Sequence, residues 1–230
     1  MPKGLFITGT DTEVGKTIVA ASLAAYFQNQ GCDIGVFKPM MSGLKREDPN
    51  SDASLLKKMS KDSSSLKEIN PFQFDEPLAP YIAAKRQGIS ISMEEVEQAW
   101  KEINHKHEFF LVEGAGGFMA PMGASYYTGH VAKMIDFPLV IVARPGLGTV
   151  NHTLLTIEAA RNMGLTVNGV IINGLHEEKK SIAEETNPRL IEEFGHVPVL
   201  GTLPWMDQIE RKTMIEMVGK RLSINGLITQ

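Results

Sequence analysis

The 230-residue sequence predicts an α/β fold in three layers, with a mostly parallel sheet between two layers of helices. Short apolar segments alternate with helical segments along the chain, as they do in sheets built from strand-helix-strand units. Val140–Val142 and Val170–Ile172 are continuously apolar, which is typical of strands buried on both faces. Near the N-terminus, an apolar strand leads into a glycine-containing loop and then a helix, the order found in phosphate-binding folds.

Six strands are predicted, at Leu5–Thr8, Ile34–Lys38, Phe109–Glu113, Leu139–Ala143, Val167–Asn173 and Val197–Leu203. Helices are predicted at Thr17–Gln30, Asp52–Met59, Ser92–His105, Thr149–Met163, Asn187–Phe194 and after Pro204. Ser92 and Glu95 have the spacing of a capping box at the start of the third helix. The polar segment Lys45–Pro80 is predicted to be a surface excursion around one short helix.

The composition favours one soluble α/β domain over residues 1–230, because 43% of the chain is hydrophobic and no linker-like segment interrupts it. A net charge of −4 gives no basic surface for nucleic acid or an anionic membrane. The lone Cys32 suits a reducing compartment, and no apolar run has the length of a membrane span or a signal peptide. We therefore expect a cytoplasmic protein that binds neither nucleic acid nor membrane.

The most informative segment is Leu5–Thr17, which reads LFITGTDTEVGKT and predicts a phosphate-binding loop. Backbone N–H groups of such a loop and the positive end of the next helix together bind anions. Lys16 would reach the β- and γ-phosphates of a nucleotide, and the Thr17 hydroxyl would bind Mg²⁺. The segment departs from the strict G-x-x-x-x-G-K-[ST] pattern, since Thr10 stands where the first glycine is required.

Polar residues at or just after the predicted strand ends form a second group of candidates, because ligands bind at this edge of a parallel sheet. Lys38 could bind an anion or be an ordinary surface lysine, although the nearby Ser42 and Gly43 favour anion binding. Glu113 ends an apolar strand, where a carboxylate is costly unless it is paired or binds a metal, so we favour Mg²⁺ binding. Asp52 could equally be a metal ligand or a simple helix cap.

The remaining candidates leave two interpretations open. Asn151 could start a helix or bind a carboxylate at the helix N-terminus. Asn173 could recognise a purine edge or occupy a turn before Gly174. His105 and His107 are spaced two apart with no obvious third ligand, so we expect them to be solvated and not metal-bound.

Together these motifs resemble the dethiobiotin synthetase family. TGTDTEVGKT, KPMMSG, NSDA, LVEGAGG, LGTVNH and LGTLPW occur here in the family's order and span nearly the whole chain. The resemblance implies a homodimeric, Mg²⁺-dependent enzyme that uses ATP and CO₂ to close a cyclic urea on 7,8-diaminononanoate. It also implies a single P-loop domain of the NTPase type, in agreement with the predicted fold.

The resemblance further implies a role for each matched residue. Lys38 matches the residue regarded as catalytic, with Lys16 and Thr12 beside it, and Thr17, Asp52 and Glu113 match the Mg²⁺ ligands. The implied nucleotide-binding residues are Glu13, Val14, Gly15, Lys16, Thr17, Asp52, Glu113, Gly114, Ala115, Gly116, Asn173, Gly174, Pro204, Trp205 and Met206. The implied substrate-binding residues are Thr12, Lys38 and Ser42, with Gly148, Val150 and Asn151 receiving the substrate carboxylate across the dimer interface.

The family's reaction passes through a carbamate and a carbamic-phosphoric anhydride, and both lysines would face the negative charge that develops. Two alternatives remain from other classes. A partitioning ATPase of the deviant P-loop kind would carry a second lysine early in the loop, where this chain has Asp11. A cobalamin-type amide synthase shares a similar ATP domain but adds a glutaminase domain, for which we expect no room in this sequence.

Overall fold

The main sheet has six parallel strands in the order β2-β5-β1-β6-β7-β8. The computed structural model describes residues 3–224 and 227. The strands of this sheet are β1 (Lys3–Gly9), β2 (Ile34–Phe37), β5 (Phe109–Glu113), β6 (Leu139–Ala143), β7 (Val167–Leu175) and β8 (Val199–Pro204). All of β5 and β6 is buried, as their continuously apolar sequences require.

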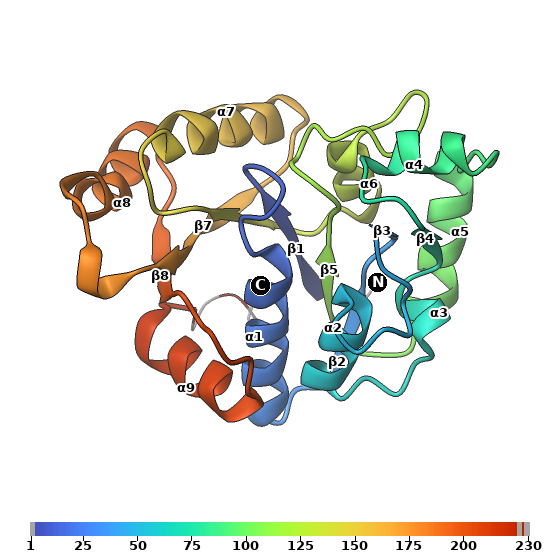
Figure 1. Ribbon diagram of the computed structural model, residues 1–230, viewed down its shortest axis with the longest axis horizontal. Coiled ribbons are helices and arrows are strands. Elements are labelled where there is room, and N and C mark those ends of the chain that lie inside the picture. The colour runs from blue at the N-terminus through green and yellow to red at the C-terminus, as the bar shows by residue number, and fades with distance from the viewer. Residues whose placement is uncertain (1–2, 225–226, 228–230) are drawn as a thin grey trace.

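Helices cover both faces of this sheet, so the three predicted layers are confirmed (Figure 1). The helices are α1 (Lys16–Asn29), α2 (Asp52–Ser60), α3 (Leu66–Ile69), α4 (Pro80–Arg86), α5 (Met93–Ile103), α6 (Thr128–Ile135), α7 (Thr149–Asn162), α8 (Ile182–Gly195) and α9 (Arg211–Arg221). The connection from β1 to β2 runs toward the β2 edge of the sheet, whereas the connections from β2 through β8 run toward the opposite edge. Right-handed crossovers therefore place α1 opposite α5 to α8, while α2 and α9 pack against α1.

Helix α1 is the most buried helix of the fold and carries the phosphate-binding loop at its N-terminus. Val19, Leu23 and Phe27 are almost fully buried, and small alanines fill much of the remaining surface. This composition suits a helix enclosed by the sheet, α2 and α9. Such enclosure fixes the direction in which the first turn of α1 points into the site.

All six predicted strands are present, and the capping box at Ser92 and Glu95 is confirmed. The predicted start of one helix at Asn187 is wrong, because α8 begins at Ile182 behind a capping box formed by Ser181 and Glu184. Pro188 lies inside α8. The prediction of one short helix within Lys45–Pro80 is wrong, because α2 and α3 both lie there. The sequence also did not predict α4, α6, the 3-10 helix η1 (Glu177–Lys179) and a small parallel sheet formed by β3 (Met40–Ser42) and β4 (Phe72–Phe74).

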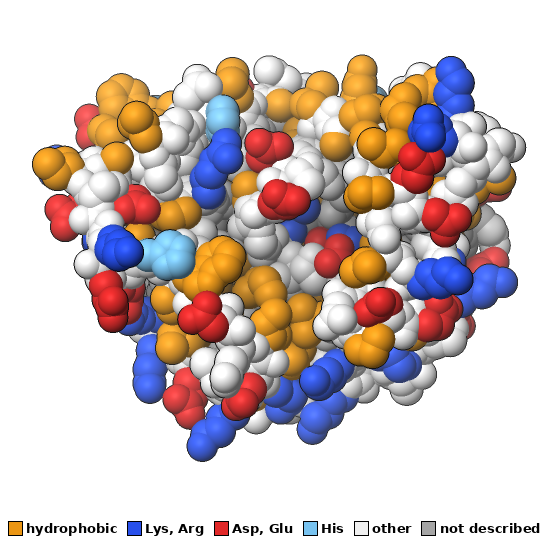
Figure 2. Space-filling model, viewed as in Figure 1, with side chains coloured by type: hydrophobic (Ala, Val, Ile, Leu, Met, Phe, Trp, Pro, Cys, Tyr) orange, Lys and Arg blue, Asp and Glu red, His pale blue; other side chains and the backbone are white. Residues whose placement is uncertain are grey.

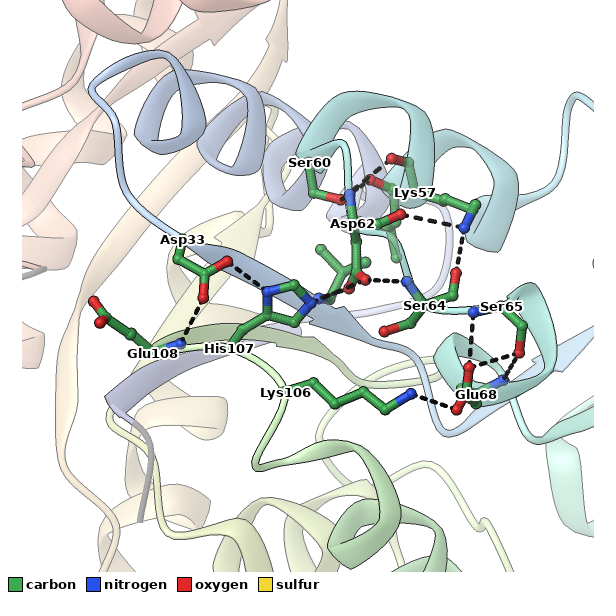
Figure 3. Close-up of polar contacts among 12 residues, drawn as sticks. Asp33, Lys57, Ser60, Asp62, Ser64, Ser65, Glu68, Lys106, His107 and Glu108 are labelled. Carbon is green, nitrogen blue, oxygen red and sulfur yellow. Dashed lines mark hydrogen bonds and ion pairs between the residues drawn. The ribbon is translucent and has the colours of Figure 1, made fainter.

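The prediction of two solvated histidines is correct for His105, which is exposed, and wrong for His107. The ring of His107 lies between two carboxylates, with Nδ1 2.6 Å from Asp33 Oδ1 and Nε2 3.1 Å from Asp62 Oδ1 (Figure 3). Asp62 is buried and also accepts a hydrogen bond from Val36 N on the edge strand β2. His107 thus helps to satisfy a structural cluster that closes one edge of the sheet.

Some predictions extend past the described residues. The single domain predicted over residues 1–230 includes residues 1–2, 225–226 and 228–230, which lie outside the described part of the chain. Within residues 3–224 and 227, no helix combines the length and the apolar character that crossing a bilayer demands.

Candidate active site

The phosphate-binding loop joins β1 to α1 and depends on backbone geometry that few residues allow. Gly15, the N-cap of α1, has a φ of 86°, and a Cβ added there would lie 2.0 Å from Asn173 Nδ2. Glu13 also has a positive φ, of 61°. Glycine is therefore required at position 15 for conformation and for space. The loop forms although position 10 carries threonine, where the strict pattern requires glycine.

Lys16 folds back over the loop, and its Nζ donates a hydrogen bond to the Asp11 carbonyl at 2.9 Å. Its side chain is largely enclosed, and burial, assisted by the positive charge of Lys38, lowers the pKa of Lys16 to about 8. With a pKa near 8, the Lys16 ammonium loses its proton more easily than an exposed lysine does, and nearby negative charge only partly offsets its positive charge. An anionic ligand such as a phosphate would supply the missing negative charge.

Four residues from four segments meet beside the loop: Thr17 of α1, Lys38 after β2, Asp52 of α2 and Glu113 of β5. Glu113 Oε1 accepts hydrogen bonds from Thr17 Oγ1 at 2.8 Å and from Lys38 Nζ at 2.5 Å. Lys38 Nζ also lies 2.8 Å from Asp52 Oδ2. The second oxygen of Glu113, Oε2, is buried with no hydrogen-bond partner among the described residues.

The electrostatics of this group follow from burial and pairing. Burial alone would lower the pKa of Lys38, but Asp52 and Glu113 outweigh it and raise that pKa, so Lys38 is held as an ammonium. Burial raises the pKa of Glu113, which is 1% exposed. Burial also opposes ionisation of Asp52, yet the charge of Lys38 prevails and lowers the pKa of Asp52. Lys38 is therefore not an ordinary surface lysine, which settles one alternative left by the sequence.

These side chains face a cavity of about 510 Å³ at the carboxyl edge of the sheet. Figure 2 shows the same face hollowed near its centre, with acidic and basic side chains in the depression. Eleven predicted site residues line the cavity, namely Thr12, Glu13, Gly15, Lys16, Thr17, Lys38, Ser42, Asp52, Glu113, Ala115 and Gly116. Val14 and Gly114 are buried next to this lining.

The sequence analysis missed one wall of the cavity. This wall consists of Met40, Met41, Ala120 and the segment 77–80, and the apolar atoms of that segment face the polar side chains. This segment belongs to Lys45–Pro80, which was predicted to be a surface excursion, and its sequence gave no sign that it folds back to the site. Its position depends on the small β3–β4 sheet, whose strands are too short for a periodic pattern.

Asn173 lies inside β7 and not in a turn after it, since the strand continues to Leu175. Its Nδ2 donates a hydrogen bond to the Val14 carbonyl at 3.1 Å, whereas its Oδ1 is buried without a partner among the described residues. The amide is thus docked on the phosphate-binding loop and has one free acceptor. The alternative that Asn173 is a turn residue is therefore wrong.

The other predicted nucleotide residues lie beyond the cavity lining. Trp205 follows β8, donates its backbone N–H to the Leu175 carbonyl, and stacks on His176 with ring centroids 5.3 Å apart. Its ring is the side-chain group nearest to Gly174, 3.7 Å from where a Cβ would be. Pro204 ends β8, and Met206 follows Trp205. The structure therefore groups these residues around an exposed indole.

The predicted carboxylate loop is separate from the cavity. Gly148 is the N-cap of α7 with a φ of 92°, and Val150 and Asn151 lie in the first turn, so Asn151 does not itself start the helix. None of the three lines the 510 Å³ cavity. A second cavity of about 400 Å³ lies between the phosphate-binding loop and α7, and Thr12 lines both cavities.

The parallel sheet, the loop and the clustered Lys, Asp and Glu side chains define a P-loop nucleotide-binding protein. The family model described as "AAA domain" matches residues 3–213. The chain is 47% identical over 228 residues to the ATP-dependent dethiobiotin synthetase BioD of Bacillus subtilis subsp. natto, covering 99% of this chain and 98% of that protein. It is 47% identical over 226 residues to the enzyme of the same name from Bacillus velezensis, covering 98% and 97%.

The chain therefore belongs to this AAA domain family and to the family of ATP-dependent dethiobiotin synthetases. Among solved structures it is similar to the MinD cell division protein of Aquifex aeolicus, with a TM-score of 0.55 and 14% identity over 99% of this chain and 92% of that one. At that identity the likeness shows the shared P-loop fold alone. It confirms the predicted fold class without favouring the partitioning ATPase alternative.

Proposed function

We propose that this chain uses ATP and CO₂ to close a cyclic urea on 7,8-diaminononanoate, giving dethiobiotin, ADP and phosphate. Membership of the family supports the overall reaction. The observation that carries the chemistry is a second buried lysine, Lys38, which shares one cavity with the loop lysine, Lys16. A switch ATPase of the deviant P-loop kind would carry its second lysine in the loop itself, where this chain has Asp11, whereas Lys38 follows β2 and can meet the second reacting group of a ligase.

Each lysine takes a separate role in this proposal. Lys16 contacts the β- and γ-phosphates, and its poorly compensated ammonium becomes stabilised when they bind. Lys38 and Thr12 hold the carbamate formed from a substrate amine and CO₂. One carbamate oxygen attacks the γ-phosphorus and releases ADP, and the second amine then attacks the carbonyl carbon of the mixed anhydride, which releases phosphate and closes the ring. Both ammonium groups face the reacting groups while negative charge develops between them.

The oxygen atoms beside the loop fit an Mg²⁺ ion. Two carboxylates and a hydroxyl, from Asp52, Glu113 and Thr17, are the oxygen donors that Mg²⁺ prefers, and Glu113 Oε2 is a buried acceptor without a partner among the described residues. When bound there, Mg²⁺ would neutralise charge on the terminal phosphates. Glu113 is a metal ligand in this proposal and is not needed as a general base.

Asn173 gives the site a means of selecting the base. Because Nδ2 is committed to the Val14 carbonyl, the free Oδ1 can accept a hydrogen bond but the amide offers that position no donor. An exocyclic amino group, as in adenine, matches this acceptor, whereas the keto oxygen of guanine would repel it. Pro204, Trp205 and Met206 would border the base on its exposed side.

We further propose a homodimer in which α7 of one subunit completes the site of the other. In the first turn of α7, Thr149 N–H donates to the Gly146 carbonyl, and no side chain among the described residues caps the helix, so the N–H groups of Val150 and Asn151 could receive the substrate carboxylate. Nearby side chains are strongly exposed for apolar residues, with 90% of Leu147 and 62% of Leu155 accessible. An isologous contact through this surface would bury them. Residues 1–230 would act as one domain, and the reaction suits the cytoplasm.

The experiment that tests the reaction is phosphate release from ATP, measured with and without diaminononanoate and bicarbonate. We expect release to depend on both, with dethiobiotin formed in equal amount to phosphate. Lys16→Ala serves as the control for contaminating ATPase activity. A partitioning ATPase would release phosphate without either addition, and a glutamine-dependent amide synthase would require glutamine.

A further inference from the structure

Lys38 occupies an unusual position for a lysine that must act on a substrate. Its Nζ lies 2.5 Å from Glu113 Oε1 and 2.8 Å from Asp52 Oδ2, so its ammonium lies between the two carboxylates proposed to bind Mg²⁺. The residue is only 3% exposed. Thr17 Oγ1, the third proposed ligand, donates to the same Glu113 oxygen. The oxygen atoms that suit a metal are thus already gathered around an ammonium group.

Physical chemistry requires some cation at this position. The Glu113 side chain is buried and the Asp52 side chain is partly exposed, and two carboxylates that approach one another at such a site destabilise each other unless positive charge lies between them. Without metal, the lysine ammonium supplies that charge and keeps both side chains oriented. A divalent ion bound by the same oxygens would supply the charge instead, and it would repel the ammonium from them. Lys38 and the metal therefore compete for Asp52 and Glu113.

We propose that Lys38 is a tethered substitute for Mg²⁺ that leaves the two carboxylates when the metal binds and only then reaches the reacting groups. This inference rests on the metal site of the proposed function. The cavity offers a destination, because Ser42 also lines it and Ser42 Oγ is a buried atom without a hydrogen-bond partner among the described residues. A lysine side chain has the torsional freedom to make this move without moving the strand.

Such an exchange couples two events that the reaction must keep together. Lys38 remains neutralised by Asp52 and Glu113 until metal, and with it the nucleotide, enters. The ammonium is then released beside the carbamate at the stage when phosphoryl transfer can follow. The cost of this coupling is a weaker metal site, since every bound ion has to displace an internal cation.

The test is a titration with Mn²⁺, a paramagnetic probe for Mg²⁺, followed by electron paramagnetic resonance in the absence of nucleotide. We expect Lys38→Met, which keeps the length of the side chain but removes its charge, to bind Mn²⁺ at least about tenfold more tightly than the wild type. The matched control is Lys16→Met. Its ammonium is hydrogen-bonded to the Asp11 carbonyl, and Glu113 and Asp52 act on it only through space, so we expect a gain clearly smaller than that of Lys38→Met.

Three results would contradict the proposal. Equal Mn²⁺ affinity in the wild type and Lys38→Met would overturn the substitution while leaving the metal site intact. An equal gain in both lysine variants would show a general effect of net charge and would also overturn it. Absence of Mn²⁺ binding in all three proteins in this nucleotide-free titration would overturn the exchange, because no metal would then compete with Lys38 for the carboxylates, and the phosphate-release assay would still test the proposed reaction separately.

A measurement on the wild type alone covers the case in which Lys38→Met fails to fold. Crystal structures with and without Mg²⁺ and ADP should show Lys38 Nζ leaving both carboxylates and approaching Ser42 Oγ when the metal is bound. An ammonium that stays about 3 Å from Glu113 Oε1 in the metal-bound crystal would refute the exchange.

Discussion

The phosphate side of the site and the carboxylate loop at α7 are built to different degrees. On the phosphate side, Lys16, Lys38 and Glu113 are buried and held by contacts within one chain. At the carboxylate loop, Leu147 and Asn151 are exposed and lie outside the cavity that contains both lysines. The side chains of the phosphate side are already positioned for a ligand, whereas the α7 region has no surface within the described chain that covers it.

This contrast indicates how the two regions acquire their geometry. Buried charges need partners in the folded state, so the fold itself must position the lysines and carboxylates. An exposed helix N-terminus carries little such cost, because water can satisfy its N–H groups until a ligand or a subunit covers it. We therefore expect substitutions on the phosphate side to act within one subunit and substitutions at α7 to act between subunits.

The largest effect is expected for Lys16→Ala. The loop lysine meets the charge of the transferred phosphoryl group, so its loss should lower kcat by roughly 10³-fold or more while the fold remains intact. Phosphate release measures the first effect and circular dichroism the second. Near wild-type turnover in a folded variant would contradict this role, since the phosphate side would then not depend on its buried lysine.

The next effect concerns metal and Glu113. Glu113→Gln keeps the shape and removes one charge, so the Mg²⁺ concentration needed for half-maximal activity should rise by roughly tenfold or more. Glu108→Gln, an exposed change just before the same strand, is the control. An unchanged Mg²⁺ titration for Glu113→Gln would make Glu113 a structural partner of Lys38.

The pKa of Lys16 predicts a pH effect on ATP binding. That pKa is lowered to about 8, first by burial and then by Lys38, so the unliganded protein carries the Lys16 ammonium below about pH 8 and loses it above. Phosphate binding needs the ammonium, and ATP affinity should therefore fall about tenfold per pH unit above about 8.

Lys38 should not contribute to this pH effect, because its pKa is raised and it stays charged through the same window. Isothermal titration between about pH 7 and 9.5 would measure the ATP affinity. The pH dependence should vanish in Lys16→Met, which has no titrating group at that position. A slope that persists in this variant would assign the effect to another residue.

The sequence predicted the parts of the molecule that are encoded locally. Strands such as Phe109–Glu113 are continuous apolar runs, and the Ser92–Glu95 cap is a short-range pattern, so both could be predicted without tertiary contacts. Lys38 and Glu113 are 75 residues apart in the sequence, but both lie at the carboxyl edge of the parallel sheet, and this shared position brings them together. The buried charge was therefore predictable once the strand ends were known.

What the sequence did not reveal depends on contacts between distant segments. The segment 77–80 becomes a cavity wall because β3 pairs with β4, two three-residue strands that have no measurable period. His107 carries no sign of its partners, since Asp33 and Asp62 come from two other loops. Motifs at ends of strands are thus easier to predict than the surfaces that enclose them.

The prediction with the smallest expected change in activity tests whether α7 contributes to the active site of the partner subunit. If the substrate carboxylate is held by α7 of the partner subunit, each active site draws Lys16 from one chain and Asn151 from the other. Lys16→Ala and Asn151→Ala, both inactive alone, are unfolded together and refolded, and random pairing of an isologous dimer gives about half heterodimers. One site of each heterodimer then carries both lesions and the other carries none.

Roughly a quarter of wild-type activity should therefore return in the mixture, because one functional site forms in about half of the dimers. The two variants must each be dimeric and nearly inactive beforehand, which size-exclusion chromatography and the phosphate assay establish. Co-refolding Lys16→Ala with Lys38→Ala, both inactive alone, is the matched control, since both lesions lie on the phosphate side of one chain and random pairing creates no new functional site. If the Asn151→Ala mixture also recovered nothing, α7 would serve only its own subunit, and the exposed helix start would lose its proposed role in the substrate site.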